Sequence, residues 1–217
     1  MKHELPGRLI VFEGIDGTGK STQIPLLAEY LTRIGHTVRV TREPTTGQYG
    51  RQIRALYEKR ESVSREDELQ LFIADRREHV EQLLLPALKR GEIVLCDRYY
   101  LSTAAYQGAH GFDPREIIKL NSFAPEPDIA LIFEVSVATS RERITNGRGE
   151  QLNDFEQEES LTKVSRIFSD LDLPCIRRIN AERSIDEVHQ SVVRAVEPIL
   201  EGAMLAPSRH PTGTEVN

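Results

Sequence analysis

The chain has 217 residues, with 28 lysines and arginines against 34 aspartates and glutamates, which gives a net charge of −6 at pH 7. This balance argues against a general nucleic-acid binder and against a protein held on a membrane surface by charge, although a small anion needs only a local basic pocket. No apolar run approaches the ~18 residues of a membrane span, and the start, MKHELPG, is not an apolar signal segment. We therefore expect a cytoplasmic protein with no nucleic-acid or membrane partner.

Two cysteines, Cys96 and Cys175, both lie in apolar runs that are typical of strands. We expect them to be core residues rather than a disulfide, which agrees with a reducing compartment. From residue 202 onward the chain has no hydrophobic period, so we expect one domain over residues 1–201 and a flexible tail over residues 202–217.

The first predicted element is a strand over residues 9–12, and the pattern G-x-x-x-x-G-K-[ST] follows it directly. This is the context that a phosphate-binding loop (P-loop) requires. Glycines let the backbone turn so that successive N–H groups and the start of the next helix point at one anion. Lys20 supplies a charge for the β and γ phosphates, and the Ser21 hydroxyl suits Mg²⁺ as a ligand. The predicted ATP-binding residues are Gly14, Ile15, Asp16, Gly17, Thr18, Gly19, Lys20, Ser21 and Thr22.

A helix is expected after this loop, and a second strand over residues 37–41. That strand runs into residues 42–47, where proline and glycine mark a loop. In open α/β sheets ligands bind at this carboxyl edge. Helices are then expected over residues 48–59 and 65–90.

The rest of the chain alternates strands with helices. The pattern predicts strands over residues 93–96, 129–135 and 175–179 and helices over residues 101–108, 139–144, 155–171 and 185–200. Such alternation indicates a parallel sheet covered on both faces, so the predicted fold class is α/β with a five-stranded parallel sheet. A polar, glycine-containing segment near residues 145–154 is typical of a mobile flap between two helices.

The P-loop by itself leaves GTPase, motor, helicase and kinase activities open. A guanine-specific GTPase is expected to carry an N-K-x-D segment, and this chain has none. An ATPase driven by oligonucleotides more often ends its acidic strand in two acids, whereas Asp97 is followed here by Arg98. An acid beside a base at a strand end suits Mg²⁺ together with a second phosphate group, which favours a kinase.

Four segments then resemble the bacterial thymidylate kinases, in the order and at about the spacing of that family. They are FEGIDGTGKST, TREP, FIADR at residues 72–76 and DRYYLSTAAYQG, and the resemblance covers about residues 8–200. It implies a P-loop NTPase fold of the nucleoside monophosphate kinase type, a homodimer, and transfer of the γ-phosphoryl group of Mg·ATP to dTMP.

The resemblance also implies roles for the residues that would hold the acceptor phosphate and its sugar. Arg42, Arg54 and Arg98 match arginines around the acceptor phosphate, which suits guanidinium forks, although a solvated side chain is the alternative for Arg54. Asp16 matches the acid that binds the sugar 3′-hydroxyl. The catalytic set implied by the resemblance is Lys20, Asp97, Arg98 and Arg148.

The base would be held by residues on two predicted helices. Phe72 and Arg76 lie four residues apart and share a helix face. In the family these positions stack on thymine and hydrogen-bond its carbonyl edge, while core packing is the alternative for Phe72. Thr103 and Gln107 resemble positions that read the thymine edge, and Tyr106 matches a tyrosine beside the sugar 2′ position, where it would crowd out a ribose.

The cation on the transferring phosphoryl group is expected from the flap. Some family members carry a basic residue in the P-loop where this chain has Gly17, and Arg148 matches the bacterial flap arginine, with Arg141 and Arg143 just before it. Asp154 departs from the family, which usually has arginine there. Ser21 would ligate Mg²⁺ directly, and Asp97 would orient the water ligands of the ion.

Two alternatives stay open on the sequence alone. One is a kinase whose acceptor is another pyrimidine nucleotide or a deoxynucleoside. The other, from a different class, is a nucleotide-binding regulatory protein without turnover, suggested only by Asp154 in the flap.

Overall fold

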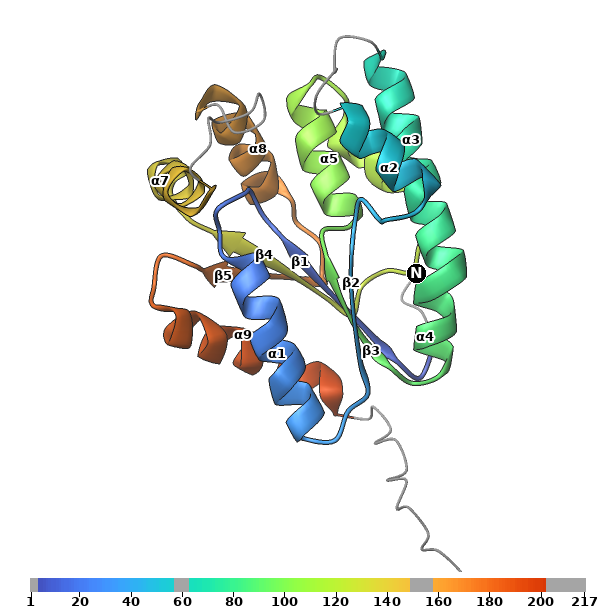
Figure 1. Ribbon diagram of the computed structural model, residues 1–217, viewed down its shortest axis with the longest axis vertical. Coiled ribbons are helices and arrows are strands. Elements are labelled where there is room, and N and C mark those ends of the chain that lie inside the picture. Colours follow the sequence, from blue (N-terminus) through green and yellow to red (C-terminus); the bar gives the residue numbers. More distant parts are fainter. Residues whose placement is uncertain (1–3, 57–62, 149–157, 202–217) are drawn as a thin grey trace, which may run out of the picture.

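The computed structural model describes residues 4–56, 63–148 and 158–201. Within them, parallel strands form one five-stranded sheet in the order β2-β3-β1-β4-β5 (Figure 1). The strands are β1 (Arg8–Glu13), β2 (Val38–Arg42), β3 (Ile93–Asp97), β4 (Ile129–Glu134) and β5 (Ile176–Asn180). The predicted α/β class with a five-stranded parallel sheet is therefore confirmed.

Helices cover both faces of the sheet (Figure 1). They are α1 (Lys20–Arg33), α2 (Gln48–Leu56), α3 (Arg65–His79), α4 (Leu85–Lys89), α5 (Tyr100–Ala109), α6 (Pro114–Leu120), α7 (Val137–Arg148), α8 (Glu158–Asp170) and α9 (Ile185–Leu200). Successive side chains of a strand point to opposite faces, and β1 shows this clearly. Leu9 and Val11 pack with α4, α5 and α8, whereas Ile10 and Phe12 pack with α1 and α9.

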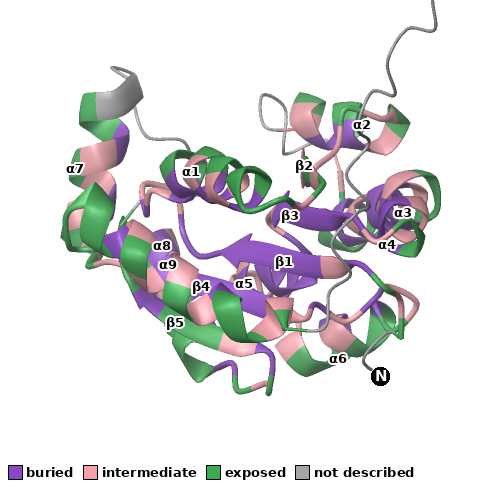
Figure 2. Ribbon diagram, turned by 90° about the horizontal axis from the view of Figure 1, so that it is seen from below, coloured by how far each residue is buried: buried purple, intermediate pink, exposed green. Residues whose placement is uncertain are grey.

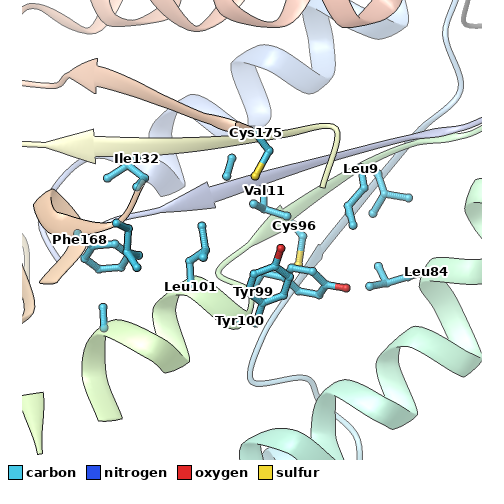
Figure 3. Close-up of a cluster of buried hydrophobic side chains, with 14 of the residues drawn as sticks. Leu9, Val11, Leu84, Cys96, Tyr99, Tyr100, Leu101, Ile132, Phe168 and Cys175 are labelled. Atoms are coloured by element: carbon cyan, nitrogen blue, oxygen red, sulfur yellow. The ribbon is translucent and has the colours of Figure 1, made fainter. Parts of the chain in front are cut away.

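Both cysteines lie in the larger of these cores. Cys96 on β3 and Cys175 just before β5 are buried and free, and Figure 3 shows them among the aliphatic and aromatic side chains of that cluster. Burial raises the pKa of the Cys175 thiol to about 11, which keeps it protonated near neutral pH. The prediction that both are core residues is confirmed.

The stretch predicted as one helix over residues 65–90 is helical throughout but has an irregular turn. A π-helical turn, η2 (Val80–Leu84), separates α3 from α4, and the backbone N–H of Leu85 donates to the carbonyl of Val80. Pro86 follows at the start of α4 and has no N–H to donate to the preceding turn. The wider turn is the local adjustment to that missing donor.

One described helix was not predicted, namely α6. Asp113 caps it by accepting from the backbone N–H of Arg115, and Pro114 occupies its first turn. This pair is a recognisable helix start, although only a short helix follows it. Elsewhere, α7 begins at Val137 rather than residue 139, and the expected start of the next helix at residue 155 lies outside the described residues.

The parallel strands place their carboxyl ends at one edge of the sheet. Phe12 on β1 and Arg42 on β2 are both in register with Asp97 on the strand between them. Figure 2 shows buried residues along the central strands, while the edge strands β2 and β5 are partly exposed. No helix in the described part of the chain is long and apolar enough to cross a membrane.

Candidate active site

The P-loop connects β1 to α1 and has the backbone that its glycines predict. Gly14 and Gly17 have φ angles of 125° and 73°. A Cβ atom at Gly14 would lie 2.5 Å from the carbonyl oxygen of Phe133, and one at Gly17 would lie 2.5 Å from that of Ser140. The Ser140 hydroxyl also donates to the carbonyl of Asp16 at 2.7 Å. Because α7 packs so closely here, a side chain at position 17 would collide with the backbone of Ser140.

Lys20 is folded over its own loop. Its ammonium group donates to the carbonyls of Gly14 at 3.0 Å and Ile15 at 2.8 Å and to the Thr18 hydroxyl at 3.2 Å. Burial, helped by the positive charge of Arg98, lowers the pKa of Lys20 to about 8. The lysine therefore lies within the phosphate-binding turn, held by neutral carbonyl groups that a polyphosphate can replace.

Arg98 joins the P-loop to the first turns of α5. Its guanidinium donates to Asp16 at 2.8 Å, to the Gly14 carbonyl at 3.2 Å, to the Ser102 hydroxyl at 3.2 Å and to the Tyr106 hydroxyl at 3.2 Å. The Tyr106 hydroxyl in turn donates to Asp16 at 3.4 Å. Three predicted site residues, Asp16, Arg98 and Tyr106, are thus in mutual contact beside the P-loop.

Glu13 is a residue of this site that sequence reasoning did not single out. It ends β1 and is 0% exposed, and its carboxylate accepts from the backbone N–H of Tyr99 at 3.0 Å and from the Ser102 hydroxyl. Burial raises the pKa of Glu13 to about 7, although the Ser102 hydrogen bond and the charge of Arg98 oppose the shift. An acid at the end of an otherwise apolar strand was the available signal.

Asp97 and Ser21 carry oxygen atoms of the kind that a divalent cation prefers as ligands. Oδ1 of Asp97 is buried and has no hydrogen-bond partner within residues 4–56, 63–148 and 158–201. Ser21 lies in the first turn of α1 and is exposed at the mouth of the P-loop. A hard cation prefers oxygen ligands of these kinds, so the donor set fits Mg²⁺.

A second cluster of buried polar side chains lies around Arg76 on α3. Its guanidinium donates to Glu43 at 2.6 Å, to Asn121 at 2.6 Å and to the Thr103 hydroxyl at 3.0 Å, and the arginine is 1% exposed. Glu43 also interacts with His79 through its other oxygen at 2.9 Å. Arg76 was predicted as a base-reading residue, but its supports Glu43, His79 and Asn121 were not recognised from the sequence.

Gln107 lies one turn after Thr103 on α5 and is 1% exposed. Both atoms of its side-chain amide, and Nε of Arg76, are buried without hydrogen-bond partners among the described residues. Buried polar atoms in native structures are nearly always paired, so a water molecule or a ligand group has to supply the partners of these three atoms. Phe72, on the same helix as Arg76, is half-buried.

The two remaining predicted arginines lie on either side of the loop after β2, one on the strand and one on α2. Arg42 ends β2 beside Asp97 and is exposed, and Arg54 on α2 donates to the carbonyl of Pro44 at 3.1 Å. The loop itself is fixed by Asp75, which accepts from the backbone N–H and the hydroxyl of Thr45. Arg54 is therefore directed at this loop rather than at solvent.

The predicted flap lies mostly outside the described residues. Arg148 ends α7, but its side chain and Asp154 are not among the residues whose positions are described. Of the two arginines before it, Arg141 pairs with Glu158 on α8, and Arg143 donates to the carbonyl of Ala181 at 3.0 Å. The helix that leads to the flap is thus tied to α8 and to the segment after β5.

The regions in which this chain matches known proteins include nearly the whole of this site. A family model described as thymidylate kinase matches residues 12–192. The thymidylate kinase of Desulfotalea psychrophila is 57% identical over 198 residues, which are 91% of this chain and 98% of that protein. That of Akkermansia muciniphila is 47% identical over 89% of this chain and 93% of its own length. The probable thymidylate kinase of Pyrococcus abyssi is 40% identical over 90% of this chain and 98% of its own length.

Proposed function

Because the chain belongs to the thymidylate kinase family, we propose that it is an ATP-dependent nucleoside monophosphate kinase that converts dTMP and ATP to dTDP and ADP. The observation that carries this function within the site is the position of Arg98. One guanidinium contacts the Gly14 carbonyl in the P-loop and the Ser102 and Tyr106 hydroxyls on α5. An arginine that lies between the P-loop and the polar side chains of α5 can bind phosphate on both sides. This position suits transfer of a phosphoryl group from a triphosphate to an acceptor phosphate.

The reaction needs no protein nucleophile. An oxygen of the acceptor phosphate attacks the γ-phosphorus in line, the bond from that phosphorus to the β–γ bridging oxygen breaks, and ADP leaves with the electron pair. The protein positions both phosphates and stabilises charge. Lys20 exchanges its loop carbonyls for phosphate oxygens, and their negative charge keeps its ammonium protonated despite a pKa of about 8 in the free loop.

The family uses ATP with a divalent metal, and we propose Mg²⁺ held by Ser21 directly and by Asp97 through water. The unpaired Oδ1 of Asp97 among the described residues supports this assignment. When bound, the ion neutralises phosphate charge that Lys20 and Arg98 alone would leave uncompensated.

Recognition of the base is assigned to Gln107 and Arg76, as the family resemblance implies. Thymine presents one N–H donor and carbonyl acceptors, with which a side-chain amide and an arginine N–H can pair. The side-chain amide of Gln107 has a donor nitrogen and an acceptor oxygen, and Nε of Arg76 is a further donor. All three atoms are buried and have no hydrogen-bond partner within the described part of the chain. On this proposal Thr103 supports Arg76, Phe72 stacks on the ring, and Tyr106 excludes the ribose 2′-hydroxyl.

The acceptor phosphate is assigned to arginines that converge on the carboxyl edge of the sheet. Arg98 and Arg42 come from the ends of neighbouring strands, and Arg54 approaches the loop after β2. Asp16, now paired with Arg98 and Tyr106, is proposed to take the sugar 3′-hydroxyl. Binding of dTMP would then replace contacts that these groups make with one another.

An acceptor panel tests the function. Steady-state rates with ATP and dTMP, dUMP, dCMP, UMP or thymidine compare base, sugar and phosphate in one experiment. We expect the highest kcat/KM with dTMP, followed by dUMP. A clear preference for any other acceptor would support the alternative kinase, and absence of ADP formation with every acceptor would support a binding protein without turnover.

Arg148 is proposed to close over the transferring phosphoryl group from the flap near residues 145–154. Arg148→Ala should lower kcat far more than it raises KM for dTMP, because the arginine acts on charge that develops in the transition state. Arg177→Ala is a matched control, since Arg177 is exposed and donates to the carbonyls of Pro174 and Ile176. An unchanged kcat in Arg148→Ala would contradict the assigned role.

The family resemblance also leads us to propose a homodimer of a single domain over residues 1–201, with the tail outside it. Cytoplasmic location stays a prediction from the sequence. Sedimentation of the full chain and of a variant that ends at residue 201 measures the assembly state and shows whether the tail affects it.

A further inference from the structure

Arg98 adopts a backbone conformation that its side chain does not favour. Its φ angle is 66°, the one positive value at a non-glycine residue in the described ranges. The left-handed region brings Cβ close to the following carbonyl, so a residue other than glycine stays there only when its surroundings hold it. Arg98 therefore needs contacts from its surroundings that keep its backbone in this conformation.

Contacts from β1 hold the turn on both sides of Arg98. On one side, the backbone N–H of Arg98 donates to the carbonyl of Phe12 at 2.9 Å. On the other, the backbone N–H of Tyr99 donates to the Glu13 carboxylate at 3.0 Å. Two successive residues of one strand thus fix the two amides that flank the left-handed residue.

The same carboxylate also orients the Arg98 side chain, through Ser102. The Ser102 hydroxyl donates its proton to Glu13, and its oxygen accepts from the Arg98 guanidinium at 3.2 Å. Because the hydroxyl has a single proton, the bond to Glu13 leaves its oxygen as the acceptor for the arginine. An amide in place of the carboxylate could instead donate to Ser102 and compete with Arg98.

We propose that Glu13 is a positioning residue for phosphoryl transfer: it holds the left-handed turn at Arg98 and, through Ser102, aims the guanidinium at the acceptor phosphate. This inference rests on the proposed function, in which Arg98 binds that phosphate. Glu13 is 0% exposed and both of its oxygens are occupied, so it acts through Arg98 rather than by touching a substrate. The ionised carboxylate suits the task because it accepts from Tyr99 and Ser102 at once, whereas the amide of a glutamine would donate from one of its two sides.

The test is a double-mutant cycle between Glu13→Gln and Arg98→Gly, read out as kcat/KM for dTMP. Glycine adopts the positive φ without strain and has no guanidinium to aim. We expect Glu13→Gln to lower kcat/KM for dTMP by about 10²-fold in the wild-type background, as misplacement of a positioning group does. In the Arg98→Gly background the same change should alter kcat/KM by no more than about twofold, because its target is gone.

A second measurement and a control variant distinguish a loss of Arg98 orientation from a general disruption of the active site. The dissociation constant for ATP should stay within about twofold of wild type in Glu13→Gln, since the P-loop contacts of Lys20 do not involve Glu13. Glu134→Gln is the matched control, because Glu134 ends the neighbouring strand β4 and pairs with the partly exposed Arg178. It should retain wild-type kcat/KM.

Ser102→Ala keeps the test usable if Glu13→Gln does not fold. This variant removes the hydroxyl between Glu13 and Arg98 but leaves the carboxylate contact with the Tyr99 amide. It should give a smaller loss than Glu13→Gln, again absent in the Arg98→Gly background. Equal losses in both backgrounds, or a parallel weakening of ATP binding, would overturn the proposal. Absence of dTMP turnover in the wild-type enzyme would instead overturn the proposed function itself.

Discussion

The two halves of the active site are built in opposite ways. The proposed phosphate half, residues 14–21, is one short turn whose glycines set its shape and whose backbone N–H groups are assigned to the phosphates. The proposed acceptor half is a cluster of buried polar side chains from distant parts of the chain. Its members are Glu43, Arg76, His79, Thr103, Gln107 and Asn121.

The difference has energetic consequences. Backbone N–H groups stay in place when a side chain is changed, so the phosphate half should keep its shape after most substitutions outside its glycines. In the acceptor half, removing one partner leaves another charged or polar group buried and unpaired. The free energy of unfolding then falls by more than the intact pair contributes to it. Substitutions in the acceptor half should therefore disturb folding and binding together, and those in the phosphate half mainly catalysis.

The largest effect is expected from Arg76→Met. Methionine fills the space but leaves Glu43 and Asn121 without their 2.6 Å partners, and loss of one member of a buried pair costs about 3–5 kcal/mol of unfolding free energy. Chemical denaturation should show this loss, and calorimetry should show weaker dTMP binding. Arg77→Met is the control, since the neighbouring Arg77 is exposed and lies over the Phe123 ring. Equal stability of the two variants would contradict this account of the acceptor half.

Lys20→Met should show the opposite pattern. The lysine contacts neutral carbonyls of its own loop, and its task is to stabilise charge during transfer, so kcat should fall by about 10²–10³-fold. KM for dTMP should change by less than about threefold, because the acceptor half is intact. Steady-state kinetics in both substrates measure the split. A rise in KM for dTMP as large as the fall in kcat would show that the two halves are not separable in this way.

The same contrast explains what could be predicted from the sequence. The P-loop was predicted residue by residue because its chemistry is local: strand, glycines, lysine and serine follow one another directly. The strands and most helices were predicted for a similar reason, since hydrophobic periods are read within one element. The π-helical turn before Pro86 and the short helix α6 were missed because neither has a period long enough to show.

The acceptor half could be assigned only through resemblance to a family. Arg76 meets Glu43 across 33 residues of sequence and Asn121 across 45, and no local pattern connects them. Glu13 was missed although it adjoins the P-loop, because its partners Tyr99 and Ser102 come from the turn after β3 and from α5. Contacts of this kind depend on strand order, which the hydrophobic pattern does not give.

Glu13 lies beside the P-loop and contacts the turn that carries Arg98, and its protonation should be visible in the pH dependence of stability. Burial raises its pKa from 4.5 to about 7 in the folded protein. A group with a raised folded pKa contributes stability below its unfolded pKa and loses it as pH rises through the folded pKa. The free energy of unfolding of wild type relative to Glu13→Gln should therefore fall by about 3 kcal/mol between about pH 4.5 and pH 8. Denaturant titrations at several pH values measure it, and a constant difference would show that Glu13 does not titrate in this range.

The smallest effect is expected from two adjacent residues of α3 that lie outside the polar cluster of the acceptor half. Phe72 is half-buried and is assigned to stack on thymine, whereas Ile73 is 7% exposed and belongs to a core cluster with Leu69, Ala104 and Ile117. Phe72→Leu should weaken dTMP binding by the ~1–3 kcal/mol that stacking contributes, with little change in stability. Ile73→Val should lower the free energy of unfolding by about 0.5–1.5 kcal/mol and leave dTMP binding unchanged. Calorimetric titration with dTMP and denaturant unfolding of both variants would separate the two faces of the helix, and a loss of stability in Phe72→Leu without a loss of binding would assign Phe72 to the core.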